Sequence, residues 1–133
     1  MSDLDDLLID FDCQPGASEA SIRNLGESVQ TALPEDYITF LRKTNGGEGM
    51  IGKSYVVFWK AEEVVRLNNS YQVNHYAPGL LLLGSDGGGE AFAFDTRKIP
   101  LSVVEVPFVG MELQYATELA PSFHVFLERL LDE

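Results

Sequence analysis

Residues 33–47 constrain the fold most, because this segment encodes one helix together with both of its ends. Pro34 suits a first helical position, where a missing N–H costs nothing, and the two acids after it favour the positive end of the helix dipole. Tyr37 and Leu41 belong to an apolar face at helical spacing. The Asn-Gly-Gly sequence that begins at Asn45 favours the left-handed backbone at which helices end. We therefore predict one well-capped helix that packs against a core.

Chain length and cysteine content limit the class of protein. A chain of 133 residues is the usual size of one domain, and such a domain buries about two-thirds of its unfolded surface. Cys13 is the only cysteine, so no disulfide can form within the chain, and a reducing compartment suits it. The first residues lack the basic and long apolar stretches of a secretory signal, and no apolar run reaches the roughly 20 residues that span a bilayer. We expect one cytoplasmic domain that does not enter a membrane.

The charge balance favours a protein partner. The chain carries 21 Asp and Glu side chains against 9 Lys and Arg, a formal net charge of -12. Such a field repels phosphates and anionic membranes and attracts cationic partners. We therefore expect no direct binding to nucleic acid, and the sequence makes no prediction of the oligomeric state.

The N-terminal segment is acidic and differs in composition from the rest. Five Asp residues and no base occur in the first dozen positions, interrupted by a few Leu, Ile and Phe residues. Such a segment is either a frayed arm that is anchored by its apolar residues or a segment that binds a partner. We predict an acidic arm over residues 1–16 and a folded domain over residues 17–133.

The remaining elements follow from apolar periodicity, which repeats every three to four residues in helices and every two in strands. These patterns predict helices at 18–29, 61–69 and 121–131, and strands at 55–59, 80–83, 90–95 and 103–108. The glycines between the second and third of these strands indicate a tight turn and a hairpin. Helices first, then a mostly antiparallel sheet and a closing C-terminal helix, define a single α+β domain.

A catalytic or metal site is not predicted. His75 and His124 lie far apart in the sequence and neither belongs to an H-E-x-x-H spacing, and a lone cysteine completes no zinc set. Cys13 has no basic neighbour that would stabilise a thiolate, so an inert thiol is expected. We expect no catalytic residue, no metal and no cofactor.

The glycine-rich turn from Gly84 to Glu90 carries charge instead. Its backbone N–H groups are able to cradle an anion and its carboxylates to bind calcium, but Glu90 stands where a phosphate loop needs a base, and two acids are too few for a calcium loop. No Lys or Arg occurs from Leu67 to Thr96. The acids in this stretch form either a solvated face or a negative patch that steers the chain toward a basic protein.

Trp59 ends an apolar strand and precedes an acidic helix. Its position suits a core residue or a binding hot spot, and the sequence leaves both interpretations open. The candidate partner-binding residues are Trp59, Glu62, Glu63, Asp86, Glu90 and Asp95.

Several of these motifs occur together in a known family. The chain resembles the SUKH superfamily, which is related to the yeast Smi/Knr cell-wall regulators. The resemblance rests on four motifs: the pattern L-P-x-D-Y-x-x-F-L-x-x-x-N-G from Leu33 to Gly46, the aromatic strand ending at Trp59, the turn that follows Leu83, and the Ser-Phe sequence that starts the final helix. The likeness extends from Ile22 to Leu131. Its structural motif residues are Leu33, Pro34, Tyr37, Leu41, Asn45, Gly46, Gly84, Gly87 and Gly88.

The resemblance implies an α+β fold and a binding function without a shared catalytic set. Many bacterial members look like immunity proteins that neutralise polymorphic toxins, often nucleases, and eukaryotic relatives act as regulatory interaction modules. The leading hypothesis is a non-enzymatic immunity protein that occludes the basic active-site surface of a toxin domain. The alternatives are a regulatory module with a non-toxin partner and a hydrolase that uses Asp86 or Glu90.

Overall fold

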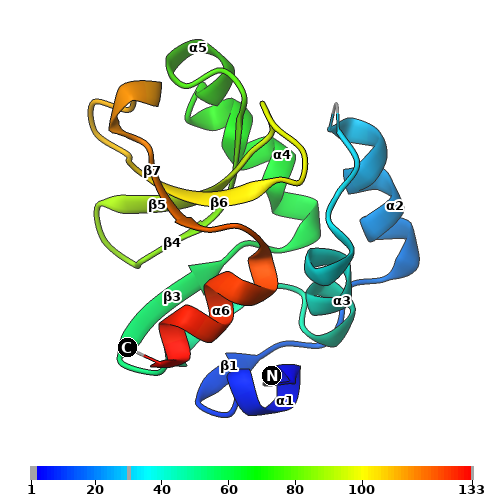
Figure 1. The fold of residues 1–133 in the computed structure, drawn as a ribbon. Coiled ribbons are helices and arrows are strands. Elements are labelled where there is room, and N and C mark those ends of the chain that lie inside the picture. The colour runs from blue at the N-terminus through cyan, green and yellow to red at the C-terminus, as the bar shows by residue number, and fades with distance from the viewer. Residues whose placement is uncertain (1–2, 30, 133) are drawn as a thin grey trace.

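The computed structural model describes residues 3–29 and 31–132. In this part of the chain seven strands form one antiparallel sheet in which each strand pairs with the next along the sequence (Figure 1). The strands are β1 (Phe11–Cys13), β2 (Gly47–Ile51), β3 (Ser54–Phe58), β4 (Leu80–Ser85), β5 (Glu90–Asp95), β6 (Ser102–Pro107) and β7 (Thr117–Ala120). The helices are α1 (Leu4–Leu7), α2 (Glu19–Ser28), α3 (Glu35–Lys43), α4 (Ala61–Ser70), α5 (Val73–Tyr76) and α6 (Phe123–Asp132), with a 3-10 helix η1 (Leu113–Tyr115). The prediction of a single α+β domain is confirmed.

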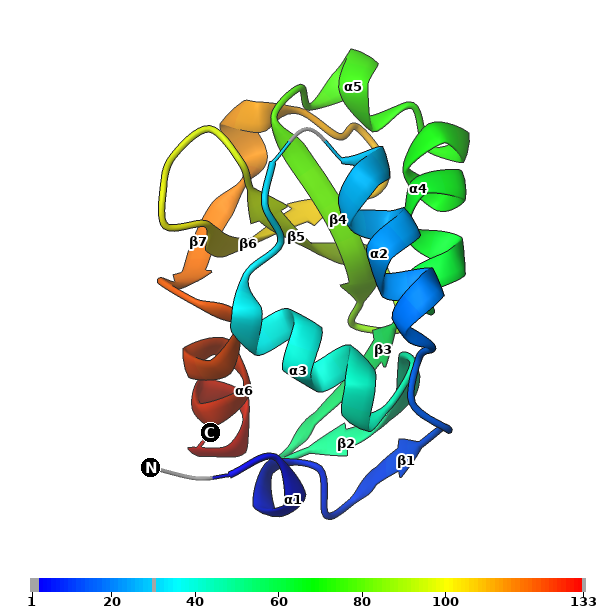
Figure 2. The ribbon, with the colours of Figure 1, turned by 90° about the vertical axis from the view of Figure 1, so that its right-hand side faces the viewer.

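Helix α3 is the element that the opening motif predicts. It begins one residue later than expected, with Pro34 as its capping residue, and has acids in its first turn and bases in its last. Tyr37 and Leu41 are buried, as their helical spacing requires. Figure 2 shows α2, α3 and α4 together in front of the sheet.

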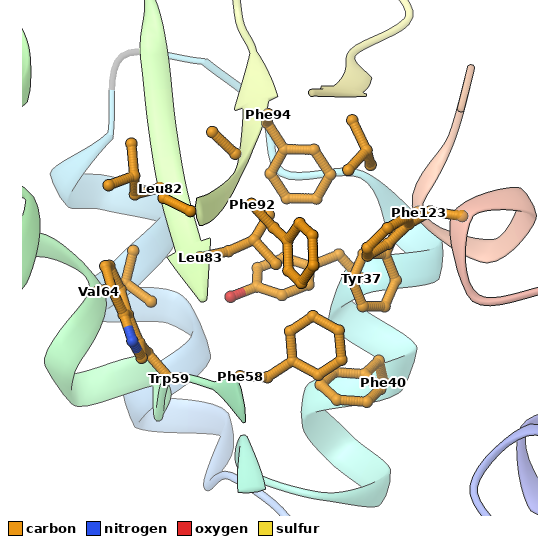
Figure 3. Close-up of a cluster of buried hydrophobic side chains, with 14 of the residues drawn as sticks. Tyr37, Phe40, Phe58, Trp59, Val64, Leu82, Leu83, Phe92, Phe94 and Phe123 are labelled. Carbon is orange, nitrogen blue, oxygen red and sulfur yellow. The ribbon is translucent and has the colours of Figure 1, made fainter. Parts of the chain in front are cut away.

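A cluster of aromatic rings joins α3 and α6 to the sheet. Phe58 of β3 packs edge-on against Phe40 of α3, with ring centroids 5.2 Å apart, and against Phe123 of α6 at 5.6 Å (Figure 3). Tyr37 lies 5.1 Å from Phe94 of β5 in the same geometry. Edge-to-face pairs add about 0.5–1.5 kcal/mol each beyond the burial of their area. The cluster therefore fixes both helices on one face of the sheet.

Asn68 of α4 completes the hydrogen bonding of β4. Its side-chain amide donates to the Leu82 carbonyl at 2.8 Å and to the Val64 carbonyl at 2.7 Å, and its oxygen accepts from the Leu82 N–H at 2.9 Å. A side chain thus supplies the partners that a neighbouring strand would otherwise supply to a buried backbone. Helix α4 is thereby held along this part of β4.

The described part of the N-terminal segment, residues 3–16, packs on the rest of the domain, so these residues are not frayed as expected, and residues 1–2 lie outside the described part of the chain. Strand β1 pairs with β2, and α1 contacts α6 at the other end of the chain. Leu7, Leu8 and Phe11 are buried. The segment folds because its few apolar side chains meet the core on one side while its carboxylates remain exposed. Lys43 of α3 forms an ion pair with Asp5.

The structure contains two further strands, β2 and β7, that the apolar periodicity of the sequence does not predict. Strand β2 contains two glycines, which weaken a strand locally, yet it pairs with β1 and β3. Strand β7, which the apolar pattern does not predict, pairs with β6. Tertiary pairing, not local propensity, forms these two strands.

The burial of the N-terminal segment is tested by Phe11→Ala. Its ring lies 6.4 Å from that of Phe40 and 6.1 Å from that of Phe58, so truncation leaves a cavity beside the aromatic cluster. We expect a loss of about 3–5 kcal/mol in the free energy of unfolding, measured by denaturant titration. Ile9→Ala is the matched control, because Ile9 in the same segment is 75% exposed. Equal free energies of unfolding for the two variants would contradict the burial of Phe11 and would support a frayed N-terminal segment.

Candidate interaction surface

The glycine-rich turn between β4 and β5 is organised by Asp86. One oxygen of its carboxylate accepts from the Gly88 N–H at 2.8 Å and from the Glu90 N–H at 3.2 Å. Gly87 has φ +81°, a backbone conformation that favours glycine. Because Asp86 occupies these two N–H groups, the turn presents negative charge and does not form an anion cradle. The predicted hairpin is confirmed by the pairing of β4 with β5.

The turn contacts a different part of the molecule on each side. A Cβ at Gly87 would lie 2.9 Å from the ring of Tyr55, so the turn packs directly on β3. On the other side, the Phe108 N–H donates to the Gly89 carbonyl at 2.9 Å, just beyond the end of β6. The acidic turn therefore joins two surface regions.

The first region is the outer face, formed by Asp12, Glu48, Met50 and Tyr55. These residues lie on one face of β1, β2 and β3, they neighbour buried Phe11, Ile51 and Val56 along the strands, and all four are exposed. The Tyr55 hydroxyl donates to the Glu48 carboxylate. This hydrogen bond is the largest cause of a raised pKa of Tyr55, and the charges of Glu48 and Asp12 add to it. The outer face thus combines two carboxylates with exposed apolar surface.

The second region is the tyrosine groove, a hollow of about 550 Å³. It is lined by Tyr71, Tyr76, Phe108, Gly110, Met111, Glu112 and Tyr115. The three tyrosines are 42%, 49% and 54% exposed. Exposed tyrosines grouped around a hollow are typical of protein interfaces, where aromatic side chains supply much of the binding energy.

The groove has a rigid wall. Tyr71, at the end of α4, stacks on Trp59 with ring centroids 6.2 Å apart and an interplanar angle of 10°. The Phe108 ring lies 4.9 Å from that of Tyr71, tilted by 38°. Trp59 is only 9% exposed. Trp59 is therefore buried like a core residue, and it supports the groove through its contact with Tyr71. The sequence left open whether Trp59 is a core residue or a binding hot spot.

The candidate residues of α4 stabilise the start of that helix. Glu62 accepts a hydrogen bond of 3.0 Å from the Asn45 side-chain amide. Glu63 accepts one of 3.1 Å from the Lys60 N–H and lies 3.6 Å from the Arg66 guanidinium. These carboxylates are thus engaged within the domain and do not line the tyrosine groove.

Asp95 is buried, and the structure does not place it on the acidic surface. Its carboxylate accepts from the Arg97 guanidinium at 2.9 and 3.0 Å and from the Arg97 N–H at 3.0 Å. The hydrogen bond with Arg97 is the largest cause of a lowered pKa of Asp95. The base that neutralises this acid lies just beyond the base-free stretch of the sequence.

The structural motif residues lie where elements meet. The Asn45 side-chain oxygen accepts from the Ala61 N–H at 2.8 Å, which ties the end of α3 to the start of α4. A Cβ at Gly46 would lie 2.5 Å from the Phe58 carbonyl oxygen. Asp36 of the same motif accepts from the His124 N–H at 2.9 Å, at the start of α6. The motif therefore holds four parts of the fold together: α3, α4, α6 and β3.

The part of the chain that the structure describes contains no group of three or more His, Cys, Asp or Glu side chains that could hold a metal ion. Across residues 3–29 and 31–132, no helix has the length and apolar character that crossing a membrane requires. A further hollow of about 510 Å³ lies between α2, α4 and the start of β4, and the side chains described there are uncharged. Charge and exposed aromatic rings thus coincide at the turn and the tyrosine groove.

These features define a small α+β domain with an antiparallel meander and an acidic, aromatic surface. The family model described as the SMI1 / KNR4 family (SUKH-1) matches residues 16–129, and the chain belongs to this family. The resemblance seen in the sequence motifs is confirmed. No match to the chain was found among curated proteins.

The Asp95 ion pair predicts a specific pH dependence of stability. Folding lowers the pKa of Asp95, so the ionised carboxylate stabilises the folded state. This contribution to stability is fully present above the ordinary pKa of an aspartate and is lost as the pH falls through the pKa of Asp95 in the folded protein. Asp95→Asn should therefore cost about 1–2 kcal/mol at neutral pH, and the difference from the parent chain should shrink below about pH 4. Denaturant titrations across pH measure this, with exposed Asp10→Asn as the control. A difference that stays constant down to pH 2 would contradict it.

Proposed function

We propose that this protein is a cytoplasmic, non-enzymatic immunity protein that binds a toxin domain and covers its basic active-site surface. The observation that carries the proposal is the position of the acidic turn, which joins the outer face to the tyrosine groove. Membership of the SMI1 / KNR4 family (SUKH-1) supports a binding function. A protein is proposed as the partner because a net charge of -12 repels the phosphates of nucleic acid.

The distribution of bases supports a cationic partner. Between residues 67 and 128 the only Lys or Arg residues are Arg97 and Lys98. Arg97 pairs with Asp95 at 2.9 Å and Lys98 with Glu118 at 2.6 Å. Both of these bases are thus paired with other acids, and neither neutralises Asp86 or Glu90. The carboxylates of Asp86 and Glu90 are therefore available to a cationic partner.

Inhibition follows from competition. A nuclease has to present a basic surface to the phosphates of its substrate, and an acidic protein competes for that surface. The carboxylates accelerate the encounter, while the exposed tyrosines supply contact area that slows dissociation. An outcome in which the chain binds a basic protein that has no toxic activity would instead support the regulatory module.

The proposal predicts association that depends on the acidic turn. Asp86→Asn keeps the oxygen that organises the turn and removes its charge, and Glu90→Gln removes the second. With the cognate toxin, identified by gene neighbourhood or pull-down, the double variant should associate roughly 3–10-fold more slowly at low salt, with a weaker salt dependence. Stopped-flow kinetics measures both quantities.

The matched control is Glu27→Gln with Glu35→Gln, which changes the net charge equally on exposed positions of α2 and α3. Its association should remain close to that of the parent chain. An on-rate independent of salt, or equal effects of the two double variants, would place the interface elsewhere. If the chain turned over a substrate, and Asp86→Asn or Glu90→Gln abolished this activity without unfolding the protein, the chain would be a hydrolase instead.

A further inference from the structure

We propose that the tyrosine groove binds one arginine side chain of the partner, with the guanidinium on the tyrosine rings and its charge matched by Glu112. This inference deepens the proposed function by naming the group that the partner inserts. Its test uses no toxin, so it can fail while the proposed function stands.

The groove offers ring faces from three separate elements. Tyr71 ends α4, Tyr76 ends α5 and Tyr115 ends η1. Tyr71 contacts the rings of Trp59 and Phe108, which restrict its motion, and 42% of its surface stays exposed to a ligand. A cation within about 6 Å of a ring centroid is attracted by the negative face of the ring. Preorganised rings reduce the entropy lost when the ligand binds.

The charge at the groove selects a cation. Glu112 is the ionisable acid in the lining, and no base lines the described part of the groove. The Gln114 side chain donates to Glu112 at 2.8 Å, which leaves the carboxylate its charge. The acidic turn borders the groove through the hydrogen bond from Phe108 to Gly89. A second copy of this chain is a poor occupant, because two acidic surfaces repel each other.

Arginine suits this combination better than lysine does. Its planar guanidinium stacks on aromatic faces, pairs with a carboxylate and is less strongly hydrated than an ammonium group. Its methylene stem can pack on the exposed tyrosine rings. An uncharged apolar side chain would use the rings and leave the negative charge of Glu112 without a cation.

The test is a titration of the full chain with the peptide acetyl-Gly-Gly-Arg-Gly-Gly-amide. The control peptide carries citrulline, which has nearly the shape of arginine without its charge. Trp59 is the only tryptophan of the chain and stacks on the groove wall, so its fluorescence reports occupancy. We expect saturable binding of the arginine peptide in the millimolar range, at least about 10-fold tighter than the citrulline peptide. Amide NMR shifts should centre on residues 71–76 and 108–115.

Variants separate the charge from the rings. Glu112→Gln should weaken arginine binding about 3–10-fold and leave citrulline binding unchanged. Tyr115→Leu should weaken it further, whereas Tyr115→Phe, which keeps the ring, should retain it. Glu27→Gln, at an exposed position of α2, removes a charge away from the groove; it is the control and should have no effect. Equal binding of the two peptides, shifts centred outside the groove or no saturable binding would each overturn the inference, and kinetics with the toxin would then decide the proposed function separately.

Discussion

The close contact of β3 with β4 is the constraint on which the rest of the fold depends. In the described chain these strands pair at two positions, Val57 with Ser85 and Phe58 with Gly84. A Cβ at Gly84 would lie 2.1 Å from the Val57 carbonyl oxygen, so only glycine permits this approach. Phe58, at the same junction, also carries the ring contacts to α3 and α6. One narrow contact thus joins both halves of the sheet and the helices that cover them.

The same junction places the proposed interaction surface. Trp59 follows β3 directly and supports the tyrosine groove, while the acidic turn follows β4 directly and packs on Tyr55. The outer face belongs to the first half of the sheet, and Phe108 extends from the second half. Residues that are distant in sequence therefore meet on one surface because the two strand ends lie side by side. The Gly84 junction thus positions the segments that form the proposed interaction surface.

Local patterns predicted much of the fold and less of the surface. The caps of α3 are a local pattern, and so is the alternation of Phe92 and Phe94 with alanines. The structure has both the predicted helix and the predicted strand. Strand β2 has too many glycines to be recognised and exists because its neighbours pair with it. The groove was missed because Tyr71 and Tyr115 become neighbours only through folding. The engagement of Asp95 had a local signal, since Arg97 is only two residues away.

We propose that one continuous surface, from the outer face across the turn to the tyrosine groove, binds the partner. Hydrogen–deuterium exchange of the chain, alone and bound to its cognate toxin, tests this most directly. We expect slower exchange on binding at residues 86–90 and 108–115, with smaller changes at 48–55. Protection confined to the hollow between α2 and α4, with these segments unchanged, would contradict it.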